Sequence, residues 1–261
     1  MDALYGLVEL LLRRPMRHAL SWTIEGLEHL PATGPALLAS NHISYLDPLC
    51  LPYATGLVGR RIRILAKSEL FEHRASAWAM RALGHIPVER GTADASGALD
   101  AAAGVLARGE LVGVFPEGTI SRDLEPMAGK TGAARLARTA GVPVVPVGLW
   151  GGHRLITAGR PRSWRWGVAI TVVMGEPFVI GPSENPRLAT DRMMEAICVQ
   201  VARARAIYPQ VPEPGAPDGW ARPPETARLR SCRGRVAQAM LDEAGAPPGP
   251  ESGSPAPPVQ P

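Results

Sequence analysis

The chain has 261 residues, of which 46% are hydrophobic and 20% charged, and its 28 basic against 24 acidic side chains give a formal charge of +4. This composition excludes a coiled coil, a collagen and a wholly disordered chain, and the charge alone is too small to indicate a nucleic-acid partner. The three cysteines, at positions 50, 198 and 232, form no C-x-x-C pair and have no metal-binding spacing. We therefore expect a globular protein with no bound metal and no nucleic-acid partner.

Residues 3–12, ALYGLVELLL, place apolar side chains at helical spacing, and Arg13, Arg14 and Arg17 follow at once. An apolar helix with adjacent cations can lie in a membrane interface, its leucines among acyl chains and its arginines near lipid phosphates. The alternative is a terminal helix packed on the core. No run reaches the ~18 apolar residues of a membrane-spanning helix, and the basic start of a signal peptide is missing. We expect residues 1–19 to form a membrane-associating amphipathic helix.

From residue 36 the chain alternates short apolar runs with amphipathic stretches. The apolar runs predict strands at 36–40, 62–66, 85–88, 111–115, 144–147 and 168–174. The stretches between and after them predict helices that begin near Asp47, cover 75–83, run from Asp94 or Ser96 to Gly109, and cover 132–140 and 191–208. This alternation predicts an α/β fold, in which residues 20–208 form a single layered domain with a mostly parallel central sheet flanked by helices.

Residues 209–261 have a different composition: prolines are frequent, and one short helical segment covers about 227–244. Such a segment buries too little apolar surface to offset the entropy lost on ordering. We therefore expect a largely disordered tail rich in proline and glycine.

A histidine follows the predicted strand 36–40, and an aspartate stands five residues later at a predicted helix start, in Asn41-His42-Ile43-Ser44-Tyr45-Leu46-Asp47. Asp47 can hold the His42 imidazole in one tautomer and stabilise its protonated form, which makes His42 a better general base. The alternative is a surface histidine beside a helix-capping aspartate. Because the chain has no G-x-S-x-G motif, the predicted chemistry is direct removal of a proton from a substrate hydroxyl, without a covalent intermediate.

Residues 115–119, Phe-Pro-Glu-Gly-Thr, come at the end of the next candidate strand, 111–115. A turn with proline and glycine at the carboxyl end of a strand presents backbone N–H groups at the edge where α/β proteins bind ligands. Ser121, Arg122 and Lys130 lie close by in the sequence and could meet an anion. The alternative is an ordinary turn with a capping threonine.

Two further strands carry candidate binding residues. The segment 84–90, Gly-His-Ile-Pro-Val-Glu-Arg, brings Arg90 to the same sheet edge, where a planar guanidinium suits a phosphate; the alternative is a solvated arginine. The segment 142–147, Val-Pro-Val-Val-Pro-Val, places Pro143 and Pro146 around an apolar strand. This pattern suits a sheet edge or the wall of an acyl-chain site, or else a purely structural strand.

The order and spacing of these four segments resemble the glycerolipid acyltransferase family, which includes the 1-acyl-glycerol-3-phosphate acyltransferases. The blocks of that family are N-H-x4-D, G-x-I-x-x-x-R, F-P-E-G-T-R-S and a proline-flanked V-P-V-like strand, and they correspond to 41–47, 84–90, 115–121 and 142–147. Residues 67–70 are similar to its Lys-x-Glu-Leu segment, and residues 129–133 to its Lys-x-Gly stretch. The resemblance covers residues 20–180 approximately and departs from the pattern at Ile120, where the family has an arginine.

The resemblance implies roles for particular residues. His42 is the expected catalytic base and Asp47 its partner, while Lys67 and Pro146 serve the acyl donor or the structure. The acceptor and its phosphate are expected to bind at Arg90, Glu117, Gly118, Thr119, Arg122 and Lys130. Because Ile120 replaces an arginine, we expect Arg122 or Lys130 to supply the missing charge.

The implied reaction is transfer of a fatty acyl group from acyl-CoA or acyl carrier protein to the free hydroxyl of 1-acyl-glycerol-3-phosphate, which gives phosphatidic acid in phospholipid synthesis. No cofactor or metal is expected, because the acyl donor is a substrate. The alternatives are a different acceptor (glycerol 3-phosphate, another lysophospholipid or a lyso-aminolipid) or a non-catalytic lipid-binding relative. The family works at the cytoplasmic face of membranes, so the resemblance favours a peripheral protein that is anchored by residues 1–19.

Overall fold

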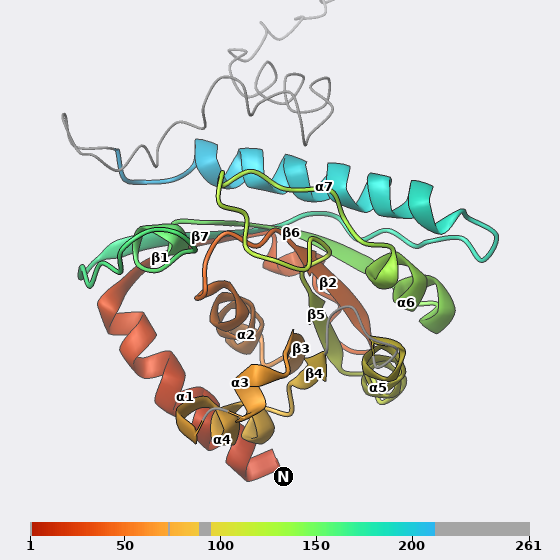
Figure 1. Cartoon of the computed structure of the whole chain (residues 1–261), viewed down its shortest axis with the longest axis horizontal. Coiled ribbons are helices and arrows are strands. Elements are labelled where there is room, and N and C mark those ends of the chain that lie inside the picture. Colours follow the sequence, from red (N-terminus) through yellow and green to blue (C-terminus); the bar gives the residue numbers. More distant parts are fainter. Residues whose placement is uncertain (1, 73, 89–94, 212–261) are drawn as a thin grey trace, which may run out of the picture.

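Short apolar runs of the chain form the strands of one mixed sheet, seen in the computed structural model of residues 2–72, 74–88 and 95–211 (Figure 1). Its strands are β1 (Leu20–Glu25), β2 (Ala36–Ser40), β3 (Ile62–Lys67), β4 (Ile86–Val88), β5 (Leu111–Val114), β6 (Val144–Trp150) and β7 (Val168–Met174). Their order across the sheet is β1-β7-β6-β2-β5-β3-β4. The five strands from β6 to β4 are parallel, whereas β7 is antiparallel to β6 and β1 runs parallel to β7.

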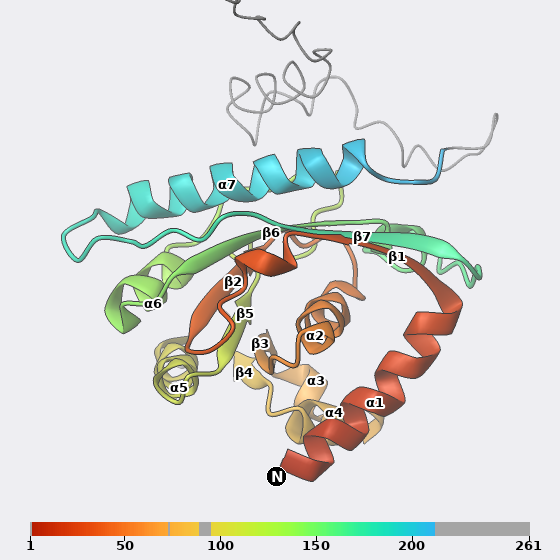
Figure 2. The ribbon, with the colours of Figure 1, turned by 180° about the vertical axis from the view of Figure 1, so that it is seen from behind.

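Helices cover both faces of the sheet (Figures 1 and 2). One face packs against α5 (Ala95–Ala107), α6 (Gly132–Ala140) and α7 (Pro186–Ala206). The other face packs against α2 (Asp47–Leu57), and α1 (Asp2–Ala19), α3 (Glu69–Glu72) and α4 (Arg74–Ala82) lie beyond α2. Two short 3-10 turns, η1 (Leu27–His29) and η2 (Gly152–Arg154), complete the described elements. Two apolar cores, one on each side of the sheet, hold the carboxyl ends of the parallel strands in place.

The packing of α7 on β6 explains one glycine in the middle of the sheet. A Cβ atom at Gly148 would lie 2.2 Å from the backbone carbonyl carbon of Gln200. The helix therefore approaches the strand backbone at a distance that only glycine allows.

The predicted α/β class and the mostly parallel sheet are confirmed, and 36–40, 132–140 and 168–174 have the predicted bounds. The strand β1 was missed, because its side chains are half-exposed at the sheet edge and its sequence has no buried apolar run. The predicted helix 191–208 begins earlier, at Pro186, where the Asn185 side chain accepts a hydrogen bond from the Arg187 N–H and caps it. The expected tail, 209–261, lies outside the described residues except for 209–211.

Of the three alternatives for residues 142–147, the sheet edge is wrong, because β6 lies inside the sheet between β7 and β2. The ladder between β6 and β7 begins only at the pair Val147–Met174, so β7 has already ended beside Pro146. The Pro146 carbonyl accepts a hydrogen bond from the Gly175 N–H at 2.8 Å. Proline has no backbone N–H to donate to a neighbouring strand, and this is tolerated here because no β7 residue pairs with Pro146.

The helix α1 has one face on the protein and one face open. Val8 is buried against Ala79 and Leu83 near α4. Leu7, Leu10 and Leu11 are exposed, as are the arginines at positions 14 and 17. Both interpretations of this segment therefore have support: the helix packs on the fold and still presents apolar and basic side chains to its surroundings. Among the described residues, no helix is both long and apolar enough to span a bilayer.

Candidate active site

A histidine–aspartate pair stands at the carboxyl end of β2, where the chain leaves the sheet and enters α2. The His42 Nδ1 lies 3.0 Å from Asp47 Oδ2, and both side chains are buried. The same Asp47 oxygen accepts hydrogen bonds from the Ile43 and Ser44 N–H groups, both at 2.7 Å. A carboxylate only accepts, so this contact places the imidazole proton on Nδ1 and leaves the Nε2 lone pair to receive a proton. The geometry therefore suits His42 as a general base.

The face of the His42 ring also contacts a neighbouring side chain. The Phe115 ring stacks on it, with centroids 4.3 Å apart and an interplanar angle of 21°. Phe115 directly follows β5, the neighbour of β2 in the sheet. The two parallel strands thus bring the base and its stacking partner together, and the imidazole cannot rotate without displacing Phe115.

Glu117 contacts the backbone of His42. Its Oε1 accepts a hydrogen bond from the His42 N–H at 3.1 Å, and the side chain is buried. Burial raises the pKa of Glu117 to about 8, the N–H groups of His42 and Met127 oppose that change, and the nearby Asp47 carboxylate adds to it. The Ser121 N–H donates to the His42 carbonyl at 2.8 Å. The loop after β5 therefore holds both sides of the His42 backbone.

Contacts with distant segments complete the support of the loop from Asn41 to Asp47. The Asn41 amide donates to the Leu149 carbonyl at 3.0 Å and accepts from the Leu149 N–H at 2.7 Å, which fixes the loop to β6. Ser44 Oγ donates to the Ile156 carbonyl at 2.7 Å, and Thr157 Oγ1 donates to the Ile43 carbonyl at 2.6 Å. Sequence reasoning gave no role to these contacts. Asn41 belongs to the recognised motif, but nothing local in the sequence signals its pairing with Leu149 or the contacts of Ser44 and Ile43 with residues 156 and 157.

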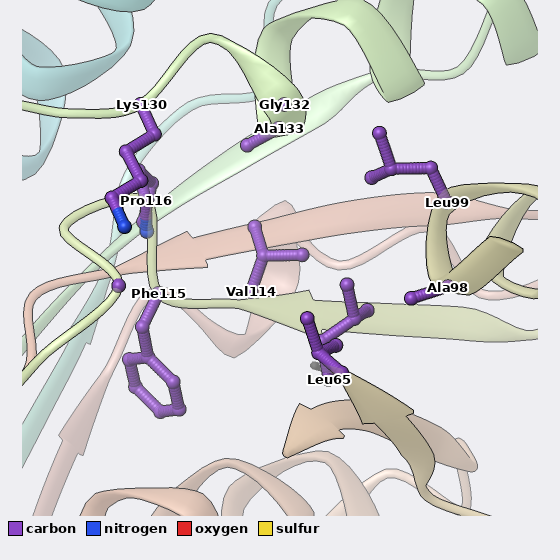
Figure 3. Close-up of a pocket in the computed structure, with 11 residues that line it drawn as sticks. Leu65, Ala98, Leu99, Val114, Phe115, Pro116, Lys130, Gly132 and Ala133 are labelled. Carbon is purple, nitrogen blue, oxygen red and sulfur yellow. The ribbon is translucent and has the colours of Figure 1, made fainter. Parts of the chain in front are cut away.

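An apolar cavity of about 200 Å³ opens at the same sheet edge, between the strands and the helices α5 and α6 (Figure 3). Its wall includes Leu65, Val88, Ala98, Leu99, Val114, Phe115, Pro116 and Ala133. Phe115 thus belongs both to the cavity wall and to the stack on His42. The Lys130 side chain also lines the cavity and lies beside Pro116 (Figure 3). Among the described residues, the cavity combines apolar walls with the Lys130 cation, which suits an amphiphilic ligand.

Lys130 reaches this place because the turn beneath it contains Gly118. The Gly118 φ angle is +71°, a conformation that favours glycine, and a Cβ there would lie 3.1 Å from Lys130 Nζ. The Lys130 N–H donates to the Pro116 carbonyl at 2.9 Å. The turn at residues 116–118 therefore contacts both the backbone and the side chain of Lys130.

The other predicted binding residues lie at the surface or outside the described part of the chain. Thr119 and Arg122 are exposed on the loop after β5. Lys67 ends β3 at the same sheet edge and pairs with Glu69 at 2.5 Å. Arg90 falls within 89–94, outside the described residues. Among the described residues, no group of three or more histidine, cysteine, aspartate or glutamate side chains could hold a metal ion.

Comparison with known proteins agrees with this geometry. The profile of the family described as Acyltransferase matches residues 21–150. The chain is 35% identical over 159 residues to a chloroplastic 1-acyl-sn-glycerol-3-phosphate acyltransferase of Arabidopsis thaliana, which covers 59% of this chain and 43% of that protein. It is 28% identical over 154 residues to a 1-acyl-sn-glycerol-3-phosphate acyltransferase of Bacillus subtilis, covering 58% of this chain and 70% of that protein.

The solved structure of the 1-acyl-sn-glycerophosphate acyltransferase PlsC from Thermotoga maritima has a similar fold. It superposes with a TM-score of 0.64 at 27% identity, over 79% of this chain and 81% of that one. The matched part spans 43%, 44% and 51% of the length of three chloroplast and algal relatives. The family match includes the loop from Asn41 to Asp47 and the loop after β5, the two segments that build the site.

Proposed function

Because the chain belongs to the acyltransferase family, we propose that it transfers a fatty acyl group from acyl-CoA or acyl carrier protein to the free hydroxyl of 1-acyl-glycerol-3-phosphate. The product is then phosphatidic acid. The observation that carries this proposal is the buried His42–Asp47 pair, in which His42 Nε2 is left as a proton acceptor. The His42 ring stacks on Phe115, which also lines the apolar cavity together with Lys130. The hydroxyl of the neighbouring Ser44 donates to the Ile156 carbonyl, and the base therefore suits direct attack by a substrate hydroxyl.

In the proposed reaction, His42 takes one proton and returns it within each catalytic cycle. His42 Nε2 takes the hydroxyl proton as the acceptor oxygen forms its bond to the thioester carbonyl carbon. Asp47 stabilises the resulting imidazolium through the Nδ1–H contact. The carbon–sulfur bond then breaks, and the leaving thiolate takes the proton back from His42. The ester and the free thiol leave, and the base returns to its starting state.

The cavity supports an amphiphilic substrate. Burial of an acyl chain against its apolar wall contributes about 0.8 kcal/mol to the free energy of binding for each buried CH2 group. Lys130 offers a positive charge for a phosphate at the edge where the base lies. We assign the lysophospholipid acceptor to this cavity, with its phosphate at Lys130 and, by family resemblance, at Arg90.

A different acceptor is the second candidate, and Ile120 is the observation that favours it. Where the family has an arginine, this chain has an apolar side chain. An acceptor with less negative charge than 1-acyl-glycerol-3-phosphate needs fewer cations in the site. A non-catalytic role is less well supported, because such a protein does not need a buried pair with its proton acceptor left open.

The test is acyl transfer from radiolabelled acyl-CoA to a panel of acceptors: 1-acyl-glycerol-3-phosphate, glycerol 3-phosphate and neutral or zwitterionic lysolipids. We expect the highest kcat/KM with 1-acyl-glycerol-3-phosphate. Arg90→Ala should raise the KM for that acceptor ten- to a hundred-fold and change the KM for the donor far less, since a lost charge-assisted contact costs about 1.5–3 kcal/mol. A higher kcat/KM with another lysolipid would identify that lysolipid as the acceptor in place of 1-acyl-glycerol-3-phosphate. No transfer to any acceptor would refute the proposed activity.

We also propose that the protein works as a peripheral protein at the cytoplasmic face of a membrane. The exposed leucines of α1 and the arginines beside them support this location. Leu10→Ser with Leu11→Ser should release the protein from anionic vesicles without removing Val8 from its contact with Ala79. Undiminished vesicle binding by this double variant would show that α1 is not the anchor.

A further inference from the structure

Two tryptophans project from the loop that joins η2 to β7. Trp164 is 84% exposed and Trp166 is 80% exposed, values far above those usual for large apolar side chains. Arg160, Arg162 and Arg165 alternate with them and are also exposed. We call residues 158–167 the Trp–Arg loop. Neither the base nor the cavity uses this loop.

We propose that the Trp–Arg loop is a docking surface for an anionic lipid membrane, distinct from the leucine face of α1. Tryptophan has a large apolar ring and one N–H donor, so it favours the headgroup level of a bilayer. Arginine makes paired hydrogen bonds to lipid phosphates. Arginine and tryptophan together occupy four of the five positions 162–166. This composition therefore matches a lipid surface in both polarity and charge.

The position of the loop agrees with such a surface. The Gly167 N–H donates to the Ala19 carbonyl at 2.8 Å, so the loop ends against the last residue of α1. The exposed Arg14 and Arg17 lie in the last two turns of that helix. Figures 1 and 2 show α1 and the start of β7 meeting at one end of the molecule. The cations of both segments can therefore face one anionic surface.

The loop is also connected to the catalytic segment. Its first residue follows Thr157, whose hydroxyl donates to the Ile43 carbonyl at 2.6 Å. The preceding Ile156 carbonyl accepts from Ser44 Oγ at 2.7 Å and from the Tyr45 N–H at 3.3 Å. Tyr45 itself is exposed on the catalytic loop. Lipid contact by the Trp–Arg loop would thus place the segment next to His42 near the surface that supplies a lipid substrate.

This inference rests on the proposed function for its biological sense, because an enzyme with a lipid acceptor must meet a lipid surface. The lipid contact itself is measurable without turnover. The experiment compares flotation of the full chain with vesicles of phosphatidylcholine alone and with vesicles that also contain phosphatidylglycerol. The variants are Trp164→Ala with Trp166→Ala, and Arg162→Gln with Arg165→Gln.

Matched controls change the same kinds of residue elsewhere. Arg135→Gln with Arg187→Gln removes two exposed arginines, one from α6 and one from the first turn of α7. In Figure 1, α6 and the start of α7 lie at the other end of the molecule from the start of β7. Val179→Ala with Leu188→Ala removes two exposed apolar side chains away from the loop. A second readout is turnover with a short-chain, water-soluble acceptor, which needs no bilayer.

We expect the tryptophan pair to lower partitioning onto anionic vesicles at least tenfold. The arginine pair should lower it about 30-fold, and mainly on the vesicles that contain phosphatidylglycerol. Neither control should change partitioning, and turnover with the soluble acceptor should stay as in the unmodified chain. That combination supports the proposal.

Equal partitioning by the unmodified chain and both loop variants would overturn it. If partitioning is equal but the KM for acyl carrier protein rises in the loop variants, the occupant is an acidic protein and the lipid proposal is wrong. If the loop variants instead abolish a concentration-dependent dimer, the occupant is a second copy and the proposal is again wrong. Failure of acyl transfer on every acceptor, with vesicle binding still dependent on the loop, would refute the proposed function alone.

Discussion

Replacement of Glu117 by glutamine should make the stability of the protein less sensitive to alkaline pH. Glu117 is buried, and its Oε1 accepts the His42 N–H. Burial raises its pKa from the ordinary value of 4.5 to about 8. In the unfolded chain the carboxyl ionises near 4.5, whereas in the folded protein it stays neutral until about pH 8. Its contribution to the free energy of unfolding is therefore fully present below pH 4.5 and is lost as the pH rises to 8.

The size of that loss follows from the two pKa values. Each pKa unit corresponds to about 1.4 kcal/mol, so a change from 4.5 to about 8 corresponds to about 5 kcal/mol in total. A glutamine keeps an oxygen that accepts the His42 N–H and has no charge to bury. The free energy of unfolding of Glu117→Gln relative to the unmodified protein should therefore rise by about 1.4 kcal/mol per pH unit between pH 5 and 8, and then level off.

Urea denaturation at about pH 5, 6.5, 8 and 9 measures this difference across and beyond the expected change. The matched control is Glu176→Gln, the same substitution at an exposed position. Glu117→Ala provides a second comparison, because it also removes the acceptor of the His42 N–H and should cost about 1–3 kcal/mol at every pH. A difference between Glu117→Gln and the unmodified protein that does not vary with pH would refute the assignment of a neutral, buried carboxyl.

Four further predictions concern the site. His42→Ala should lower kcat at least ~100-fold with an unchanged urea midpoint, and Asp47→Asn should also be severe; near-normal turnover in a folded His42→Ala protein would refute the mechanism. Asn41→Ala should lower the free energy of unfolding by about 2–4 kcal/mol, since it breaks both buried hydrogen bonds to Leu149. Lys130→Ala should raise the KM for a phosphate-bearing acceptor roughly tenfold and that for a neutral lysolipid far less, and equal effects would remove Lys130 from phosphate binding. Leu99→Phe should shorten the preferred acyl chain in a chain-length series, with about a fourfold loss for each displaced methylene, and an unchanged series would show that the chain binds elsewhere.

Much of the sheet was predictable because its strands are buried on both faces. Residues 36–40, 111–114 and 168–174 are apolar or small throughout, and each appears as a short run between polar turns. The strand β1 carries no such signal, since an edge strand needs fewer buried side chains. The helix α1, Asp2–Ala19, lies within the residues expected to be helical, 1–19, although Pro15 stands inside it. A proline inside a helix removes a hydrogen bond and usually ends it, yet α1 continues through Pro15 to Ala19.

The chemistry of the site was predictable where it depends on strand ends. His42 follows β2 and Phe115 follows β5, and neighbouring parallel strands place their carboxyl ends at one edge. The direction of the Glu117 side chain was not predictable in this way. A glutamate in a turn is expected at the surface, and only the three-dimensional structure shows it turned inward to the His42 backbone.

The departure at Ile120 leaves the contacts that support His42 intact. The loop after β5 supports His42 through the Glu117 carboxyl and the Ser121 N–H, and these two contacts flank position 120 without using its side chain. An arginine there would add charge at the loop surface and no support to the catalytic backbone. This separation explains how the family pattern can vary at one residue while the histidine–aspartate geometry is kept. It also means that acceptor preference and proton transfer should respond to different substitutions, with charge changes at Arg122 or Lys130 acting on KM and changes at Glu117 acting on stability.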